Sequence, residues 1–230
     1  MAINIPHRFL DRVVELPFQT KVNIIIIGTF NPGLPVIENL TEEELAIFEG
    51  IRTTSKFQTF NEVMNFYDRP QNRFWKIMDF LHMPEFYADG NYRLVNEYGI
   101  KYYRNMGNRL QVYERQQQFC QTKGIFITDI VQRIHPESFR EIYDNFPDTA
   151  IERGNPDWND QAISRIIREH QPSKVLINFN HNSDAIPNIR ERIEGLINEY
   201  PQITFLNMPS TSGAAGGKYD ELIPIWQQHF

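Results

Sequence analysis

Four short apolar runs, rich in β-branched residues, are spaced along the chain. They cover residues 22–27, 124–131, 174–179 and 203–206. Apolar runs of this length are typical of strands that are buried on both faces of a sheet. The first run ends at Gly28, where the chain is free to turn. The pattern therefore predicts four strands at the centre of the fold.

Between these runs, apolar residues recur every three or four positions, as in amphipathic helices. Thr41 and Glu44 form a capping-box pattern, and Asp157 or Asn159 is placed to cap a helix that stops at Pro172. Strands that alternate with helices pair in parallel through right-handed crossovers. The sequence therefore predicts an α/β fold, a three-layer α/β/α sandwich with a central four-stranded parallel sheet. Helices are expected over residues 42–51, 74–81, 108–122, 186–199 and 219–228, and over the capped segment that carries Ile163 to His170.

The length of 230 residues suits one domain, taken as residues 1–230. Hydrophobic residues make up 41% of the chain and charged residues 23%, which is ordinary for a globular domain and argues against disorder. The stretch around residues 83–107 is rich in Tyr and Asn and only weakly periodic. We interpret it as an insertion in the domain.

Several classes of protein are excluded by what the sequence lacks. Cys120 is the one cysteine, so there is no internal disulfide and no cysteine-held cluster. No apolar stretch is long enough to span a membrane, and Pro6 and charged residues stand where a signal peptide is apolar. No residues have the spacing of a metal site. We expect a cytoplasmic protein with no membrane partner, no metal and no cofactor.

The loops that follow the predicted strands carry the candidate chemistry. In open parallel sheets, ligands bind beyond the carboxyl ends of the strands. The loops 28–33, 128–129 and 207–213 are rich in glycine, proline and small polar residues. Each alone is typical of a turn, but all three are expected to meet at one edge of the sheet.

These loops resemble motifs of the uracil-DNA glycosylase superfamily. Asn31-Pro-Gly33 resembles the water-activating motif of the mismatch-specific uracil-DNA glycosylases, and Pro70-Gln-Asn-Arg-Phe-Trp-Lys76 resembles a second segment of that group. Met208-Pro-Ser-Thr-Ser212 and Asp129-Ile130 are similar to the hypoxanthine-DNA glycosylase branch. The motifs keep the family's order from residue 22 to about residue 217.

The resemblance implies a monofunctional DNA glycosylase that acts in base excision repair. Such an enzyme hydrolyses the N-glycosidic bond of a damaged or mismatched base in DNA, here uracil or hypoxanthine. The base is flipped into a pocket, a water is held on the far face of the sugar, and fixed donors meet the charge on the leaving base. DNA is therefore the expected partner.

The resemblance also assigns roles to individual residues. Asn31 and Asn72 are the catalytic candidates, and an amide positions a water rather than taking its proton. Tyr67, or Phe30, is the candidate to stack on the base, and Asp129 to accept a hydrogen bond from a base N–H. The base-binding candidates are Gly28, Thr29, Phe30, Tyr67 and Asp129, and the DNA-binding candidates are Ser210, Thr211, Ser212 and Lys218.

Simpler interpretations stand beside these roles. Asn31 is a common turn residue before a proline, Asn72 can cap the helix that begins at Arg73, and Tyr67 or its neighbour Phe66 can be part of the core. Ser210 and its neighbours can cap the last helix. A non-catalytic nucleic-acid- or nucleotide-binding relative is one alternative function. A nucleotidylyltransferase is another, although the first loop lacks that family's histidines.

The net charge of −6 argues weakly against a nucleic-acid partner, but the charges are segregated. Acidic residues gather at positions 38–49, whereas basic residues interleave with tyrosines at positions 93–115. Basic and aromatic residues together are typical of a surface that binds nucleic acid. We therefore expect local, salt-dependent DNA binding on one face.

Overall fold

The computed structural model describes residues 3–10, 21–69, 72–82, 92–94, 100–102, 109–139, 142–143, 147–212, 215 and 218–230. A parallel four-stranded sheet lies at its centre, in the order β5-β2-β8-β9. The strands are β2 (Ile24–Gly28), β5 (Ile125–Asp129), β8 (Lys174–Ile177) and β9 (Thr204–Asn207). The register pairs Gly28 with Asp129 and Ile27 with Ile177. The four predicted strands and their parallel pairing are confirmed.

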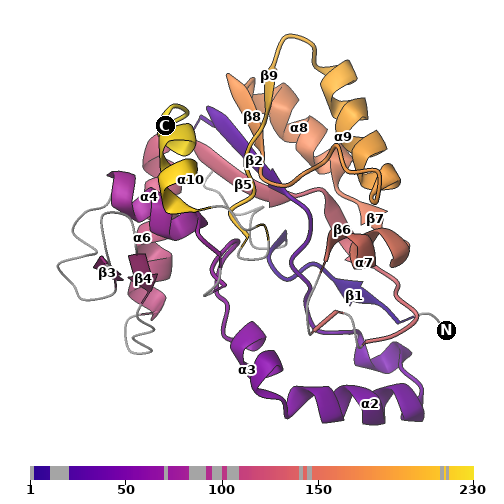
Figure 1. The fold of residues 1–230 in the computed structure, drawn as a ribbon. Helices are drawn as coiled ribbons and strands as arrows, with labels where there is room; N and C mark the ends of the chain where they lie inside the picture. Colours follow the sequence, from indigo (N-terminus) through magenta and orange to yellow (C-terminus); the bar gives the residue numbers. More distant parts are fainter. Residues whose placement is uncertain are drawn as a thin grey trace.

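Helices cover both faces of this sheet (Figure 1). On one face lie α4 (Phe74–His82), α6 (Arg109–Lys123) and α10 (Tyr219–Gln227). On the other lie α8 (Asp160–His170) and α9 (Pro187–Glu199). Successive residues of a strand point to opposite faces, so Ile24 and Ile26 enter one core while Ile25 and Ile27 enter the other. The three-layer α/β/α sandwich is confirmed.

The helix caps bear out one local prediction and correct another. Helix α2 (Glu42–Arg52) begins with a capping box, in which the Thr41 hydroxyl accepts from the Glu44 N–H at 3.2 Å and the Thr41 N–H donates to Glu44 Oε2 at 2.8 Å. Asn159 precedes α8 but makes no side-chain cap bond. Its amide instead donates to the carbonyl oxygen of Asp129 at 2.9 Å, so it fixes the end of β5.

The pattern predicted one strand over the apolar run at residues 124–131, and this prediction is wrong. β5 ends at Asp129, and Val131 opens β6 (Val131–Ile134) in a second sheet. The N–H groups of Ile130 and Val131 donate to the carbonyl oxygens of Gly28 and Thr29 at 3.0 and 3.1 Å. These bonds bend the chain over the end of β2, and a run of apolar residues carries no sign of such a bend.

The second sheet is antiparallel and has the order β1-β6-β7, with β1 (Ile5–Pro6) and β7 (Asp157–Trp158) on either side of β6. The sequence did not predict β1, β7 or the short helices α3 (Ser55–Asn61) and α7 (Asp148–Arg153). The two strands have two residues each, too few for an alternation, and helices of six and seven residues complete fewer than two turns, too few for a clear helical period. A single 3-10 turn, Ile37–Asn39, precedes α2.

Helices α2 and α3 extend away from the parallel sheet (Figure 1). Buried aromatic rings join them to the rest of the domain: Phe48 lies 5.4 Å from Phe139, and Phe57 lies 5.3 Å from Tyr143, between ring centroids. Most of the predicted insertion at 83–107 lies outside the described residues. Its described part is a pair of antiparallel strands, β3 (Tyr92–Leu94) and β4 (Ile100–Tyr102). Across the described ranges, no helix is long and apolar enough to cross a membrane.

Candidate functional site

A cavity of about 350 Å³ opens at the carboxyl edge of the parallel sheet. Each wall comes from a loop that follows a strand or precedes a helix, as expected for this class of sheet. The candidate residues Gly28, Thr29, Phe30, Asn31, Tyr67, Asn72, Asp129, Ser210, Thr211 and Ser212 all line it. Lys218 does not line it and is exposed beside α10. Seven further residues complete the lining: Arg69, Pro147, Asp148, Asn178, Phe179, Asn180 and Ala215.

Asp129 is the most constrained of these residues. Its Oδ2 accepts hydrogen bonds from Asn31 Nδ2 at 2.6 Å and from His7 Nε2 at 2.8 Å. Only 1% of each of the His7 and Asp129 side chains is exposed. Because a carboxylate oxygen only accepts, the Asn31 amide nitrogen must face Asp129. The side-chain oxygen of Asn31, Oδ1, is thereby turned away from the carboxylate.

The loop that carries Asn31 is held by residues 6–8. The Arg8 N–H donates to the backbone carbonyl oxygen of Asn31 at 2.8 Å, and the Gly33 N–H donates to the backbone carbonyl oxygen of Pro6 at 2.7 Å. Residues 6–8 therefore run alongside the loop and fix the position of Asn31 by these hydrogen bonds. Sequence patterns missed this contribution, because a single histidine near the amino terminus has no distinctive spacing.

Two buried polar atoms face each other across Gly28. Asp129 Oδ1 and Tyr67 Oη have no hydrogen-bond partner within the described ranges. A Cβ on Gly28 would lie 2.6 Å from Tyr67 Oη and would also collide with Asp129 Oδ1. Only a glycine leaves room for both atoms. Unsatisfied buried polar atoms are rare in folded proteins and mark places where a ligand or water belongs.

The Tyr67 hydroxyl stays protonated. Burial, and then the negative charge of Asp129, raise the pKa of Tyr67 well above its usual value. Its backbone φ of +59° lies in the left-handed region, which is strained for an aromatic residue and costs about 1–3 kcal/mol. Such strain persists where the surrounding structure needs the side chain in one place. Here it directs the hydroxyl toward Gly28.

The structure places both stacking candidates at the cavity. The Tyr67 ring packs against Phe74, with 4.9 Å between the centroids. Phe30 is buried and meets the edge of the His7 ring at 5.4 Å. Both rings therefore also pack in the interior of the protein, and stacking on a base stays a prediction. Phe66 is buried in the core.

Asn72 makes a contact at the start of α4 and also lies in the cavity wall, and a catalytic role stays a prediction. Its Oδ1 accepts from the Phe74 N–H at 2.9 Å at the start of α4, which is a capping contact. The residue also lines the cavity. Its neighbour Arg69 brings a guanidinium group to the same wall, over the Phe60 ring at 5.5 Å. Burial lowers the pKa of Arg69, and the charge of Asp129 partly offsets this.

Asp148 is a second carboxylate in the cavity wall, and sequence reasoning missed it. It opens the short helix α7, and its Oδ1 accepts from Thr29 Oγ1 at 2.8 Å. Burial raises the pKa of Asp148, the Thr29 hydrogen bond lowers it, and the charge of Asp129 raises it further. A carboxyl group with a raised pKa in a cleft is typical of acid–base chemistry. No motif surrounds Asp148, so its place in the cavity wall could not be predicted from the sequence.

The closing loop is fastened to the rest of the wall. The Thr211 hydroxyl accepts from Asn178 Nδ2 at 3.0 Å, and the Thr211 N–H donates to Asn178 Oδ1 at 3.2 Å. The Thr211 side chain is thus buried and engaged inside the protein. The Arg73 N–H donates to the Thr211 carbonyl, and Arg73 Nη1 to the Ser212 carbonyl, each at 2.8 Å. Ser210 Oγ accepts from the Ser212 N–H at 3.3 Å. Phosphate binding by this loop and by Lys218 stays a prediction.

The expected basic face falls largely on residues outside the described ranges. Of the cationic positions at 93–115, Arg104 lies outside them, and the side chains of Arg93, Lys101 and Arg109 are not described. Among the residues that line the cavity, the charged groups are Asp129, Asp148 and Arg69. The interior of the cavity is therefore more acidic than basic.

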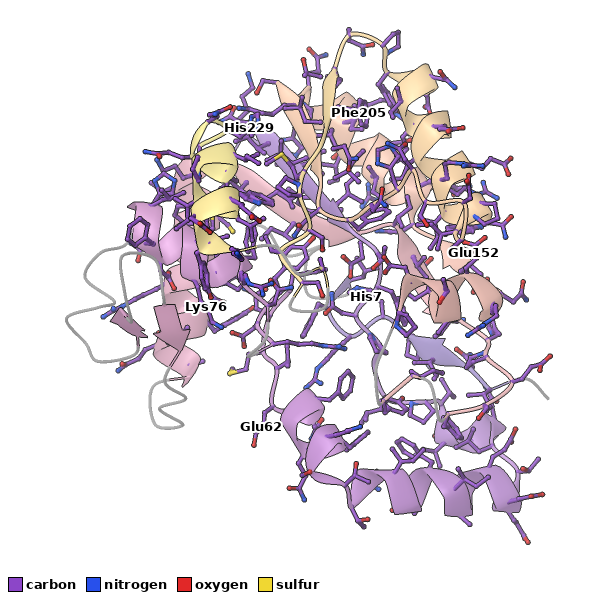
Figure 2. All side chains as sticks on the ribbon, in the orientation of Figure 1. His7, Glu62, Lys76, Glu152, Phe205 and His229 are labelled. Carbon is purple, nitrogen blue, oxygen red and sulfur yellow. The ribbon has the colours of Figure 1, made fainter. Side chains whose placement is uncertain are left out.

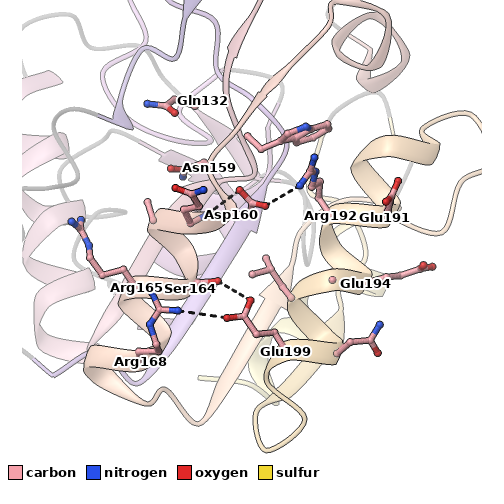
Figure 3. A pocket seen from close by; sticks show the side chains of 16 residues that line it. Gln132, Asn159, Asp160, Ser164, Arg165, Arg168, Glu191, Arg192, Glu194 and Glu199 are labelled. Atoms are coloured by element: carbon pink, nitrogen blue, oxygen red, sulfur yellow. Dashed lines mark hydrogen bonds and ion pairs between the residues drawn. The ribbon is translucent and has the colours of Figure 1, made fainter.

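A larger open groove of about 940 Å³ lies between α8 and α9, away from the motif residues (Figure 3). Its charged side chains engage one another: Arg192 Nη1 lies 3.3 Å from Asp160 Oδ2, and Arg168 Nη1 lies 3.5 Å from Glu199 Oε1. The Arg192 guanidinium also covers the Trp158 ring at 5.2 Å. Because these groups satisfy each other, we place the candidate site in the smaller cavity, where buried polar atoms lack partners.

The residues that line the cavity come from positions 28 to 215 of the chain, so only the fold brings them together. Comparison of the sequence with known protein families and with curated proteins gives no match.

Proposed function

We propose that this protein is a DNA glycosylase that hydrolyses the N-glycosidic bond of a damaged or mismatched base, uracil or hypoxanthine. The observation that carries the proposal is the meeting of Asn31, Tyr67, Asn72 and Asp129 in one cavity. Asn31, Asn72 and Asp129 stand in three of the motifs that resemble the uracil-DNA glycosylase superfamily, and Tyr67 lies just before the second of them. The cavity volume, about 350 Å³, suits a single base that is flipped out of the DNA.

The amide of Asn31 supports a role in holding the attacking water. Its Nδ2 is committed to Asp129, so its side-chain oxygen, Oδ1, is the atom left to accept a hydrogen bond. An acceptor held in this way orients a water but cannot remove its proton. The carboxylate of Asp148 in the same wall is the group suited to that second task.

The charges of the cavity support a base as the ligand rather than a phosphate. Asp129 and Asp148 outnumber Arg69 among the charged groups of the lining. Two carboxylates repel a triphosphate, which argues against the nucleotidylyltransferase alternative. A neutral base enters without this penalty, while the phosphates of the DNA stay at the rim beside Ser210 and Ser212.

The test is an excision assay. Oligonucleotides that contain one uracil or one hypoxanthine, single-stranded and in duplexes, are incubated with the protein and a metal chelator. Alkali then cleaves any abasic sites. We expect strand cleavage with at least one of these bases and none with undamaged DNA. Binding to these oligonucleotides without cleavage would favour the non-catalytic relative instead, and consumption of nucleoside triphosphates would favour the transferase.

A further inference from the structure

His7 lies near the centre of the molecule, beneath the cavity (Figure 2). Both of its ring nitrogens are committed. Nδ1 accepts from the N–H groups of Phe9 and Leu10 at 2.9 and 3.1 Å, so it carries no hydrogen. The ring hydrogen therefore sits on Nε2, which faces Asp129 Oδ2 at 2.8 Å. His7 donates to the carboxylate and has one orientation in which to do so.

The backbone prevents the ring from moving away. The His7 N–H donates to the Gln132 carbonyl in β6 at 2.8 Å, and the next residue, Arg8, donates to the Asn31 carbonyl at 2.8 Å. Rings also enclose the imidazole, with Phe30 and Phe66 each 5.4 Å away between centroids. A reorientation of His7 would break these contacts together.

The donors that meet at Asp129 occupy only one of its two oxygens. Oδ2 takes the hydrogen bonds from both His7 and Asn31, while Oδ1 is buried and has no partner in the described part of the chain. Oδ1 lies against Gly28 beside Tyr67 Oη. A fixed acceptor and a fixed hydroxyl donor thus stand side by side in the wall.

We propose that His7 is a positioning residue, which holds Asp129 so that Oδ1 faces the bound base as an acceptor for a ring N–H. The proposal rests on the proposed function, since it takes the ligand to be a base. The neighbouring Tyr67 hydroxyl donates to the carbonyl oxygen that adjoins this N–H. A base that carries a ring nitrogen without hydrogen at this position leaves Asp129 Oδ1 unpaired and is rejected.

The first experiment compares free bases by titration calorimetry. Uracil and hypoxanthine are paired with 3-methyluracil and 1-methylhypoxanthine, in which a methyl group replaces the ring hydrogen. The wild-type protein should bind the parent base at least about tenfold more tightly, as expected for a lost hydrogen bond to a charged group. Equal binding within both pairs, or binding of no base, overturns the inference.

Variants of His7 then separate positioning from folding. His7→Leu removes the donor and should reduce the preference for the parent base to less than about threefold, since a freed carboxylate can rotate. His7→Gln offers an amide N–H near the place of Nε2 and should restore part of the preference. A merely structural histidine would instead weaken both bases of a pair equally and leave the ratio unchanged. His170→Leu is the matched control, because His170 Nδ1 also accepts a backbone N–H, from Val22 at 3.3 Å, but lies away from the cavity.

A second variant keeps the inference testable if His7→Leu does not fold. In Asp129→Asn, the donors on His7 and Asn31 still require the side-chain oxygen, so the new amide N–H₂ must face the ligand. This variant should lose affinity for uracil and gain affinity for cytosine, whose ring nitrogen accepts. An unchanged preference for uracil contradicts the inference. Because binding is measured apart from excision, a protein that binds in this pattern without cleaving DNA refutes only the proposed function.

Discussion

Thr29 Oγ1 donates a 2.8 Å hydrogen bond to Oδ1 of Asp148, and this contact joins the end of β2 to the start of α7. It brings a second carboxylate to the cavity that already holds Asp129. Burial and the charge of Asp129 both raise the pKa of Asp148. The two carboxylates therefore differ in character, since one is bound by two donors and the other is poised to exchange a proton.

Asp148→Asn should lower the rate of base excision by about 100-fold, which is the lower range for loss of a general base, with a smaller effect on KM. The wild-type rate should rise with pH through the raised pKa of Asp148, because the ionised form accepts the proton. Single-turnover excision rates across pH 4 to 8 measure both effects. Asp184→Asn is the control, since Asp184 is an exposed carboxylate paired with Arg190 at 2.8 Å. A variant with the wild-type rate and pH profile would remove Asp148 from the mechanism.

The same substitution should increase stability at neutral pH. The pKa of Asp148 is higher in the folded protein than in the unfolded chain, so the folded state binds the proton more strongly and loses stability as pH rises through this range. Asn keeps the Thr29 hydrogen bond without the buried charge. Asp148→Asn should therefore melt at a higher temperature than wild type at pH 7. The difference in melting temperature should shrink below about pH 3.9, where Asp148 of the wild type is protonated in both the folded and the unfolded state.

Asn31→Ala should abolish most of the excision activity, because it removes the carbonyl oxygen proposed to hold the water and one of the two donors on Asp129. Asn72→Ala should cost stability as well, about 1 kcal/mol for the lost cap on α4. Excision rates and thermal melts of the two variants distinguish these effects. Full activity in both variants would show that the catalytic residues lie elsewhere.

Gly28→Ala should block the cavity. The added methyl would lie 2.6 Å from Tyr67 Oη and would also meet Asp129 Oδ1, so both must shift, at a cost of about 1–3 kcal/mol. Base binding should be lost. Gly50→Ala provides the control: Gly50 lies within α2, and nothing stands within 4 Å of the new Cβ. Alanine there should stabilise by up to about 1 kcal/mol and leave binding unchanged. Binding calorimetry and thermal melts test this contrast, which fails if Gly28→Ala binds uracil like wild type.

Lys76 offers a pH-dependent test of the core beneath α4. Burial, and then the charge of Arg73, lower the pKa of Lys76 to about 8. The unfolded chain holds this proton up to about pH 10.4, so Lys76 destabilises the fold below pH 8 and does so progressively less above it. Lys76→Met should therefore be more stable than wild type at pH 7, by at most about 3 kcal/mol, with a smaller difference at pH 9.5. Urea unfolding at both pH values measures this, with the exposed Lys123→Met as control. An equal difference at both pH values would contradict it.

The hydrophobic pattern predicted the sheet well, because β2, β5 and most of β8 are buried and so consist largely of apolar residues. The edge strand β9 is partly exposed, so the expected burial on both faces is wrong for this strand. It also placed Gly28 and Asp129 at strand ends, which was enough to expect them at one edge. The pattern failed where the chain leaves regular structure. The bend at Ile130 depends on hydrogen bonds to Gly28, and strands as short as β1 and β7 have no period.

The site was predictable only where motifs mark it. His7 and Asp129 are 122 positions apart, and no pattern in the residues around either one indicates that the two side chains meet. Asp148 follows a proline at the start of a short helix, which is an ordinary place for an aspartate. His7 and Asp148 become candidates for a role in the site only through the residues that the fold places beside them, so patterns along the chain could not reveal that role.

Residues near both ends of the chain support the same cavity, and this has a consequence for how the protein folds. Residue 7 supplies the support beneath Asp129, while residue 211 is fastened to Asn178 after the last strand of the sheet. Contacts between such distant parts form late and make folding slow. No fragment of the chain contains a complete cavity, so the pocket is present only in the finished fold. A ligand that fills it should raise the melting temperature of the whole domain.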